Sequence, residues 1–410
     1  MSLDLAKWEL IEGNLATPAG FRAAAVAAGI KKPGGSLDLA MIFSDSPDTT
    51  AAGVFTTNRV AAAPVLLSRQ NLIDSRGSCR AVVVNAGNAN ACTGRAGMQT
   101  AQETTRLAAR LLAIESSQVL VASTGVIGVP LKPDLILSQL PVLKAQLCRE
   151  NAAAVAKAIM TTDTFPKTCV ARSQVKGKTV HIAGIAKGSG MIHPHMATML
   201  SFITTDAAMG ERMLHNQLAA AAESSFNRVT VDGDMSTNDT AVALASGMAE
   251  ITVIPGNASR AWFAEGLALV CQSLARMIAR DGEGASKMVT VEVMGARTPK
   301  DADRVARAIA NSPLVKTALA GSDPNWGRII CAAGYSGAKF DPSKIDVSVN
   351  HTPLCQKGLD AGFDESTVRA ELDQKEIVLY VDLHAGKATA RMWTCDFTRG
   401  YIDINASYRS

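Results

Sequence analysis

The stretch that most constrains this chain lies almost at its midpoint, in the run Lys187–Leu200, which reads KGSGMIHPHMATML. Its two glycines permit backbone angles that other residues avoid. Pro194 fixes the chain three residues before the Ala197 carbonyl. The apolar residues that follow Thr198 are typical of a buried strand. A fold that contains this run must therefore turn sharply and then enter a sheet directly after a hydroxyl residue.

Thr198 is a candidate nucleophile because cleavage of the bond before it would supply its own base. Attack of the Thr198 hydroxyl on the Ala197 carbonyl would move the acyl group from nitrogen to oxygen, and hydrolysis of the ester would free an α-amine. Such an amine has an ordinary pKa of about 7.7–8.0, so part of it is neutral at pH 7. The alternative is that the Ala-Thr pair simply begins a strand, and the dipeptide alone does not decide.

Composition excludes several functions for this chain. The length of 410 residues predicts two or three domains, and the hydrophobic fraction of 47% is enough to form large cores. The charged residues make up 19%, the net charge is +4, and the dispersed Lys and Arg residues do not indicate nucleic-acid binding. The sequence shows neither a secretory signal nor an apolar run long enough for a membrane span. Eight cysteines without a C-x-x-C pair predict reduced thiols in a cytoplasmic protein.

Hydrophobic periodicity predicts alternating helices and strands, which places the chain in the α/β or α+β class. The expected helices are Ala96–Ile114, Glu150–Met160, Glu211–Ser225, Arg260–Arg280 and Asp301–Ala310. The expected strands are Ala81–Val84, Val119–Ala122, Thr179–Ile185, Val229–Val231, Met288–Val293, Ile345–Val349 and Ile377–Leu383. The clearest break in composition is Asp281–Lys287. It predicts a first domain over residues 1–287 and a second over 288–410.

A second candidate element follows the predicted strand Val119–Ala122, which runs into Ser123–Gly128. A strand that ends in Thr124-Gly125 presents a hydroxyl donor beside an unhindered backbone N–H. That pair suits the oxyanion of a tetrahedral intermediate in acyl transfer. An ordinary turn from strand to loop is the alternative.

Three further polar features are candidates for substrate contacts. The segment Met160–Thr164 either lines a polar pocket or stops a helix. Glu283 lies between two glycines, where an acid can closely approach a ligand amine. Lys187, directly before Gly188, is suited to a carboxylate. Solvated loop charges are the alternative for both charged residues.

No metal site is predicted. His193 and His195 would share a strand face, but the sequence offers no evident third ligand. Asp232, Asp234 and Asp239 lack the spacing and the closing Glu of a calcium loop, and a loop or helix-capping role is favoured.

Taken in order, these segments resemble the ornithine acetyltransferase family of arginine biosynthesis. The resemblance covers almost the whole chain and is most specific over Lys187–Leu200. The other matching stretches are Ser123–Gly128, Met160–Thr164, Asp281–Ala285, Ser322–Arg328 and Tyr401–Ala406.

The resemblance implies a precursor that cuts itself at Ala197–Thr198 into an α chain (1–197) and a β chain (198–410), which associate as two α and two β chains. It implies acetyl transfer from N2-acetylornithine to glutamate through acetyl-Thr198, without a cofactor. It leaves open whether acetyl-CoA is a second donor, which would add N-acetylglutamate synthesis. By the same resemblance, Thr124 and Gly125 form the oxyanion hole. The implied substrate contacts are Thr161, Lys187, Thr198, Glu283, Asn405 and Ser410.

The resemblance also implies a self-processing α-β-β-α layered main domain with a smaller α/β domain in the C-terminal half. The family often has Asn where this chain has His195, which bears on the rate of self-cleavage rather than on the nucleophile. Two alternatives are an N-terminal-nucleophile aminopeptidase or amidase of related fold that passes the acyl group to water, and a non-catalytic metabolite-binding protein. The segments around Lys187 and Glu283 favour the transferase.

Overall fold

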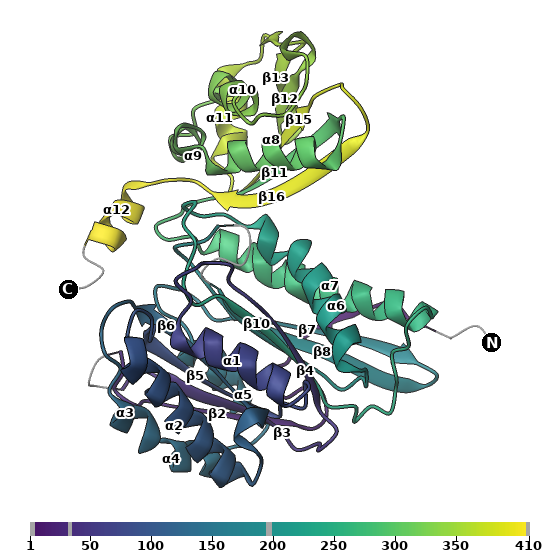
Figure 1. Cartoon of the computed structure of the whole chain (residues 1–410). Coiled ribbons are helices and arrows are strands. Elements are labelled where there is room, and N and C mark those ends of the chain that lie inside the picture. Colours follow the sequence, from purple (N-terminus) through teal and green to yellow (C-terminus); the bar gives the residue numbers. More distant parts are fainter. Residues whose placement is uncertain (1–4, 32–34, 194–198, 407–410) are drawn as a thin grey trace. The chain divides into compact units, whose positions relative to one another are not determined.

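The computed structural model describes residues 5–31, 35–193 and 199–406, which form two compact units. The first unit contains the described residues up to Met191, then 199–227 and Met235–Leu274. The second contains Ile192 and His193, Arg228–Asp234 and the described residues from Ala275 onward. The predicted boundary at residue 287 stays a prediction. Figure 1 shows the elements along the chain.

Two sheets build the first unit. The smaller sheet has four strands in the order β2 (Phe21–Val26), β3 (Leu39–Ser44), β5 (Ala81–Asn88) and β6 (Val119–Val126). The larger has six strands in the order β1 (Glu9–Ile11), β7 (Lys167–Val175), β8 (Lys178–Lys187), β9 (Leu200–Thr205), β10 (Thr240–Ala245) and β4 (Thr50–Phe55).

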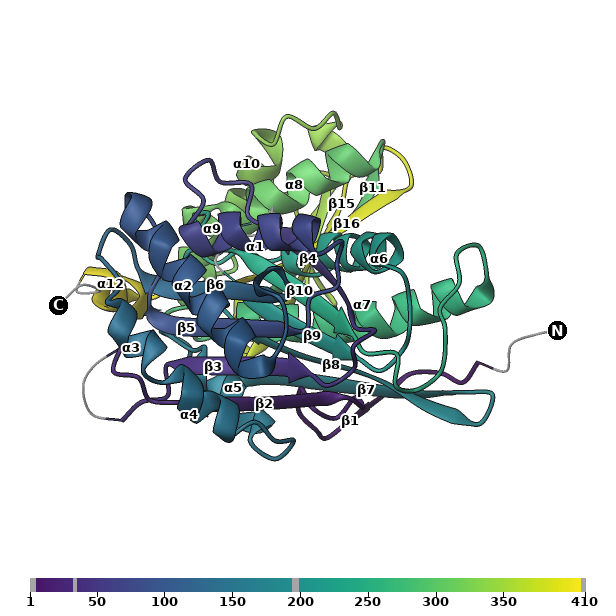
Figure 2. The ribbon, with the colours of Figure 1, turned by 60° about the horizontal axis from the view of Figure 1, so that its bottom comes forward.

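The two sheets face one another, and helices cover their outer faces (Figure 2). One apolar core joins side chains of both sheets, including Ile42, Val84, Phe202 and Val242. A second core packs the smaller sheet against helices on its other face. The helices of this unit are α1 (Ala63–Asp74), α2 (Gly94–Leu112), α3 (Pro133–Leu137), α4 (Leu140–Ala145), α5 (Ala152–Ala158), α6 (Glu211–Glu223) and the part of α7 (Ala258–Arg280) up to Leu274.

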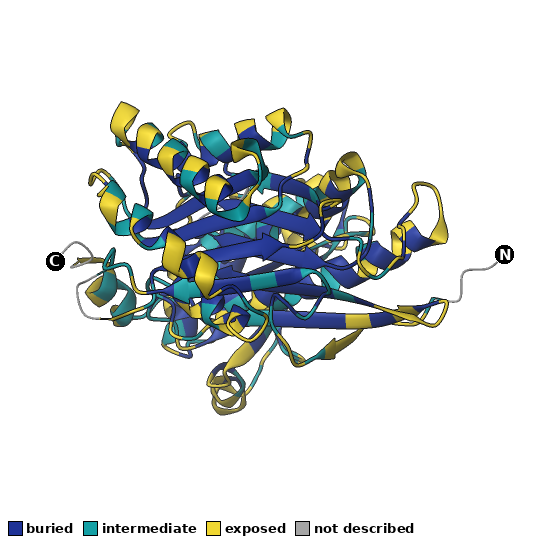
Figure 3. Ribbon diagram, turned by 90° about the horizontal axis from the view of Figure 1, so that it is seen from below, coloured by how far each residue is buried: buried dark blue, intermediate teal, exposed yellow. Residues whose placement is uncertain are grey.

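Burial from both sides explains the sequence of the central strands. All residues of β9 and β10 are buried, and these two strands pair in parallel (Figure 3). Gly184 of β8 lets α7 approach closely, because an added Cβ would lie 2.9 Å from Val270 and from Leu274. The α-β-β-α layering predicted from the resemblance is therefore confirmed.

The second unit is a six-stranded sheet with its own apolar core. Its strand order is β14 (Leu359–Asp360), β13 (Thr352–Gln356), β12 (Asp346–Val349), β15 (Glu376–Asp382), β11 (Met288–Ala296) and β16 (Ala388–Cys395). Its helices are α8 (Pro299–Asn311), α9 (Pro313–Ala320), α10 (Trp326–Gly334), α11 (Glu365–Leu372) and α12 (Arg399–Ala406). Side chains of α8 to α11 share the core with the sheet. A smaller α/β unit in the C-terminal half was predicted and is confirmed.

Local sequence explains where the helices of this second unit begin. The Thr298 hydroxyl accepts from the backbone N–H of Asp301 at the start of α8. Ser312 caps α9 in the same way, and a proline follows each cap at the first helical position, where its missing N–H costs nothing.

All five predicted helices and six of the seven predicted strands are present, with ends displaced by a few residues. The prediction of a strand over Val229–Val231 was wrong. Only Val229 forms an isolated bridge, to Trp393, directly after a 3-10 turn that ends at Arg228. The N–H of Val231 instead bonds to the Ile192 carbonyl, so the segment is irregular although its residues are β-branched.

The structure bears on two predictions from composition, the free cysteine thiols and the lack of a membrane span. All eight cysteines lie in the described residues, and each is a free thiol. Among the helices formed by residues that the structure describes, none combines the length and apolar character needed to cross a bilayer.

The core between the two sheets should dominate the stability of the first unit. We expect Phe202→Ala to lower the free energy of unfolding by about 3–5 kcal/mol, because Phe202 is 1% exposed and a cavity would remain. Ile73→Ala, at a side chain that is 69% exposed, should change it by less than about 0.5 kcal/mol. Denaturant unfolding followed by circular dichroism measures both, and equal losses would contradict the packing described.

Candidate active site

Three of the predicted site residues meet around the Lys187 ammonium. Lys187 is the last residue of β8, and its Nζ donates to Thr161 Oγ1 at 2.7 Å and to Thr124 Oγ1 at 3.3 Å. Thr124 lies on β6, in the other sheet, and Thr161 follows α5. Lys187 is 3% exposed, so these contacts form within the unit rather than at its surface. One buried cation therefore joins the ends of strands from both sheets.

Asp163 supplies the negative charge that this cation requires. Its Oδ1 lies 2.6 Å from Lys167 Nζ and accepts from the Gly188 N–H at 2.8 Å. Its Oδ2 accepts from the Thr161 N–H at 3.0 Å and lies 4.0 Å from Lys187 Nζ. Burial alone would raise the Asp163 pKa, but Lys187, Lys167 and these hydrogen bonds lower it to about 2. The group is therefore a carboxylate at neutral pH.

The Lys187 contact also orients the Thr124 hydroxyl. An ammonium donates and never accepts, so Thr124 Oγ1 is the acceptor of this bond. The hydroxyl hydrogen of Thr124 is not used in this bond and can be donated elsewhere. This leaves Thr124 as a donor at the end of β6, which is the role that an oxyanion hole requires.

Gly125 holds a backbone conformation that favours glycine, with φ of +129°. An added Cβ would lie 2.3 Å from the carbonyl carbon of Gly87, its partner on β5. The amide-rich end of β5 supports this pairing, because Ser123 Oγ donates to Asn85 Oδ1 at 2.5 Å and Asn85 Nδ2 donates to the Asn88 carbonyl at 2.9 Å. The unusual backbone of Gly125 is thus fixed by the neighbouring strand.

The second unit brings together two other predicted residues. Asn405 Nδ2 of α12 donates to Glu283 Oε2 at 2.7 Å. Gly284 makes this approach possible, since its φ is +67° and an added Cβ would lie 2.3 Å from the Tyr401 backbone nitrogen. Thr398 Oγ1 also donates to the Gly284 carbonyl at 2.6 Å. Glu283 is therefore a buried carboxylate held by the chain's last described helix.

The remaining predicted site residues, Ala197, Thr198 and Ser410, lie outside the described residues, as does His195. Met199 is the first described residue after the predicted cleavage bond, and its N–H donates to Asp239 Oδ1 at 2.9 Å.

Sequence reasoning missed three residues of the candidate site in the first unit. Asp163 was noted only within a polar segment that also suited a helix stop. Its partner Lys167 begins β7 four residues later, and because the residues between them are not helical, no local periodicity marks the pair. Asp239 was assigned to a loop or cap. No group of His, Cys, Asp and Glu side chains among the described residues is arranged to hold a metal ion.

Comparison with known proteins identifies the family. The sequence model of the ArgJ family matches residues 22–410. The chain belongs to the ArgJ family. Its relatives include the arginine biosynthesis bifunctional protein of Symbiobacterium thermophilum, 50% identical over 404 residues, which are 98% of this chain and 100% of the relative. The protein of the same name from Geobacter sulfurreducens is 51% identical over 393 residues, 95% of this chain and 99% of the relative.

A solved structure agrees with this assignment. The ArgJ crystal structure from Bacillus halodurans is 46% identical, with a TM-score of 0.50, and the match covers 52% of this chain and 100% of that one. The resemblance inferred from sequence is confirmed, and with it the placement of this chain among the acyltransferases of arginine biosynthesis. The alternative of an aminopeptidase or amidase is not favoured.

The ionisation of Asp163 should make the free energy of unfolding depend on pH in the acid range. Its folded pKa of about 2 lies below the ordinary value of about 3.9, so its contribution is complete above pH 4 and disappears as pH falls toward 2. Asp163→Asn should lower stability at pH 7 by about 3–5 kcal/mol, because two buried lysines lose their counter-charge. The same substitution should also reduce the fall in the free energy of unfolding between pH 4 and pH 2. Unfolding curves across pH measure both; Asp74→Asn, on an exposed helix face, is the control. An unchanged acid slope in Asp163→Asn would contradict this role.

Gly125 should tolerate no side chain. We expect Gly125→Ala to lower the free energy of unfolding by about 3 kcal/mol, since it adds both backbone strain and a clash with β5. Gly128→Ala also places a side chain at a positive φ, +79°, but no atom lies within 4 Å of its added Cβ, so it should cost about 1 kcal/mol. Equal unfolding midpoints for the two variants would show that β5 does not fix Gly125.

Proposed function

We propose that this chain transfers an acetyl group from N2-acetylornithine to glutamate through acetyl-Thr198, after cleaving its own Ala197–Thr198 bond. The observation that carries the proposal is the buried Lys187, which donates to both Thr124 and Thr161 in a chain of the ArgJ family. Curated relatives of near-identical length bear the name arginine biosynthesis bifunctional protein.

The proposed transfer has two balanced halves. Thr198 Oγ attacks the acetyl carbonyl, and its proton passes to the free α-amine of the same residue. The tetrahedral oxyanion is stabilised by the Thr124 hydroxyl and the Gly125 N–H. Its collapse breaks the amide bond, the departing ornithine nitrogen takes the proton, and acetyl-Thr198 remains. The glutamate amine then attacks this ester, so that N-acetylglutamate leaves and the Thr198 hydroxyl is restored.

Substrate charges suit the residues proposed to bind them. Both substrates carry an α-carboxylate, for which Lys187 with Thr161 offers a cation and a hydroxyl. Glu283, held by Asn405, offers a carboxylate to the side-chain ammonium of ornithine. The contact of Ser410 with substrate belongs to the same proposal. Because acetylornithine and glutamate share their backbone groups, Lys187 and Thr161 can serve both halves of the reaction.

The proposal also covers the association of the two cleaved chains, their location in the cell and the lack of a cofactor. The chains 1–197 and 198–410 remain associated after cleavage, as two α and two β chains, in the cytoplasm. The transfer needs no metal or cofactor, because the ester intermediate carries the acetyl group. Acetyl-CoA is a candidate second donor, since a thioester acylates a hydroxyl by the same steps.

The nucleophile is tested by substitution at Thr198. Wild-type protein should give two chains on intact-mass analysis, with the break before Thr198, and should move labelled acetyl from acetylornithine to glutamate. Thr198→Ala should stay whole and inactive, whereas Thr198→Ser retains a hydroxyl and should be cut. Release of labelled acetate without N-acetylglutamate would favour an amidase, and an uncut but active wild type would overturn the mechanism.

A further inference from the structure

Asp239 holds the residue that follows the proposed nucleophile. It lies directly before β10, which pairs in parallel with β9, and this register places it beside Met199. Asp239 Oδ1 accepts from the Met199 N–H at 2.9 Å, and the Thr240 N–H donates to the Met199 carbonyl at 3.0 Å. Both polar backbone groups of Met199, which is covalently joined to Thr198, are therefore fixed by the start of β10.

The second oxygen of this carboxyl group is not satisfied. Asp239 is completely buried, and its Oδ2 has no hydrogen-bond partner among the described residues. The Thr56 hydroxyl lies beside it but donates to the Ser236 carbonyl at 2.8 Å. Burial raises the pKa of Asp239 well above its ordinary value, and the Met199 N–H, the neighbouring Thr56 hydroxyl and the positive charge of Lys187 only partly oppose this. A buried carboxyl oxygen without a partner costs free energy, so a ligand for it is expected.

Asn238, the residue before Asp239, fixes the backbone beside the proposed oxyanion residue Thr124. Asn238 Nδ2 donates to the Ser123 carbonyl at 2.8 Å and to the Ala89 carbonyl at 2.6 Å. Ser123 directly precedes Thr124. Two adjacent side chains at the start of β10 thus fix the residue before Thr124 and the residue after Thr198.

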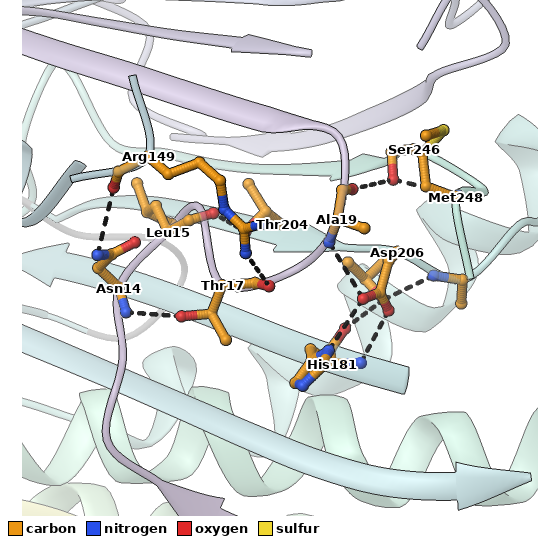
Figure 4. A network of polar contacts seen from close by, with 12 residues as sticks. Asn14, Leu15, Thr17, Ala19, Arg149, His181, Thr204, Asp206, Ser246 and Met248 are labelled. Carbon is orange, nitrogen blue, oxygen red and sulfur yellow. Dashed lines mark hydrogen bonds and ion pairs between the residues drawn. The ribbon is translucent and has the colours of Figure 1, made fainter. Parts of the chain in front are cut away.

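Asp206, at the opposite end of β9, is a buried aspartate of this unit that can be compared with Asp239. Asp206 follows β9 and uses both oxygens (Figure 4). Its Oδ1 accepts from the His181 N–H at 2.8 Å, and its Oδ2 lies 3.0 Å from His181 Nδ1 and accepts from the Ala19 N–H at 3.2 Å. Asp206 is as buried as Asp239 but is fully satisfied, so burial alone does not explain the unpaired oxygen of Asp239.

We propose that Asp239 is a positioning residue for the nucleophile: its Oδ1 fixes the Met199 N–H, and its Oδ2 receives the α-amino group that Thr198 acquires on cleavage. This inference rests on the proposed function. Before cleavage the Thr198 nitrogen is an amide with one hydrogen. After cleavage it is an amine whose protonated form would be a counter-charge for Asp239 and would favour the ionised carboxylate despite its burial. The neutral amine can still donate an N–H to Oδ2 while its lone pair accepts the Thr198 hydroxyl proton. Asp239 thereby turns the new terminus toward its own hydroxyl.

Asp239→Asn tests this role, because the amide keeps an oxygen for Met199 and replaces only Oδ2. The variant should still be cut, but kcat for acetyl transfer should fall about 10- to 100-fold, with a smaller change in KM, because the base is misplaced. The α-amine also loses a neighbouring negative charge, so its pKa should fall and the acid limb of the kcat profile should move to lower pH. Lys187 and its partner Asp163 are present in both proteins and do not produce this difference.

Asp206→Asn is the matched control. It should lower thermal stability while leaving kcat and the acid limb unchanged, because it acts at the other end of β9. If Asp239→Asn is cut and shows wild-type kcat with an unmoved acid limb, the inference is overturned while the proposed function stands. If wild-type protein neither cuts itself nor transfers acetyl, the proposed function fails instead.

A second measurement uses the wild-type protein, so the test does not depend on the folding of Asp239→Asn. Threonine labelled with 15N allows the Thr198 α-amine of the cut protein to be titrated by NMR in the folded and the denatured state. A carboxylate partner predicts a higher amine pKa in the folded protein. A folded value equal to or below the denatured one would overturn the role of Oδ2.

Discussion

The first unit depends on the burial of one positive charge, the Lys187 ammonium. A cation taken out of water is costly unless it is paired and hydrogen-bonded. Here the cost is offset by Asp163 and by two threonine hydroxyls that come from different parts of the chain. The ends of β6 and β8 and the loop after α5 must therefore meet whenever the unit is folded. The same contacts assemble the proposed acyl-transfer site.

Asp163 makes this arrangement possible because it serves both the charge and the backbone. It accepts from the N–H groups of Thr161 and Gly188 and pairs with Lys167 as well as Lys187. Gly188 begins the turn that leads toward the predicted cleavage bond. The carboxylate consequently connects the start of that turn to the cation that orients Thr124. Chemistry and stability share the same contacts, so substitutions here are expected to affect both.

The part of the site that follows from local sequence was predictable. The strand-like run before Thr124 and Gly125 predicted that they lie at the end of a strand, and Lys187 was a candidate cation because of the turn that follows it. Asp163 and Asp239 were not predicted, because their roles come from contacts that no local pattern specifies. Asp239 meets Met199 only through the parallel register of β9 and β10, 40 residues apart in sequence. β-Branched residues predicted a strand at Val229–Val231, where hydrogen bonds to Ile192 and Trp393 impose an irregular path instead.

The central claim is that Thr198 carries the acetyl group, and the most direct test is to trap that ester. Cut protein mixed with N2-acetylornithine in the absence of glutamate should release ornithine, and the chain that begins at Thr198 should gain the mass of one acetyl group. Peptide mapping should place that group on Thr198, and added glutamate should remove it as N-acetylglutamate. Transfer to glutamate without any acetylated chain, or with the acetyl group on another residue, would contradict the claim.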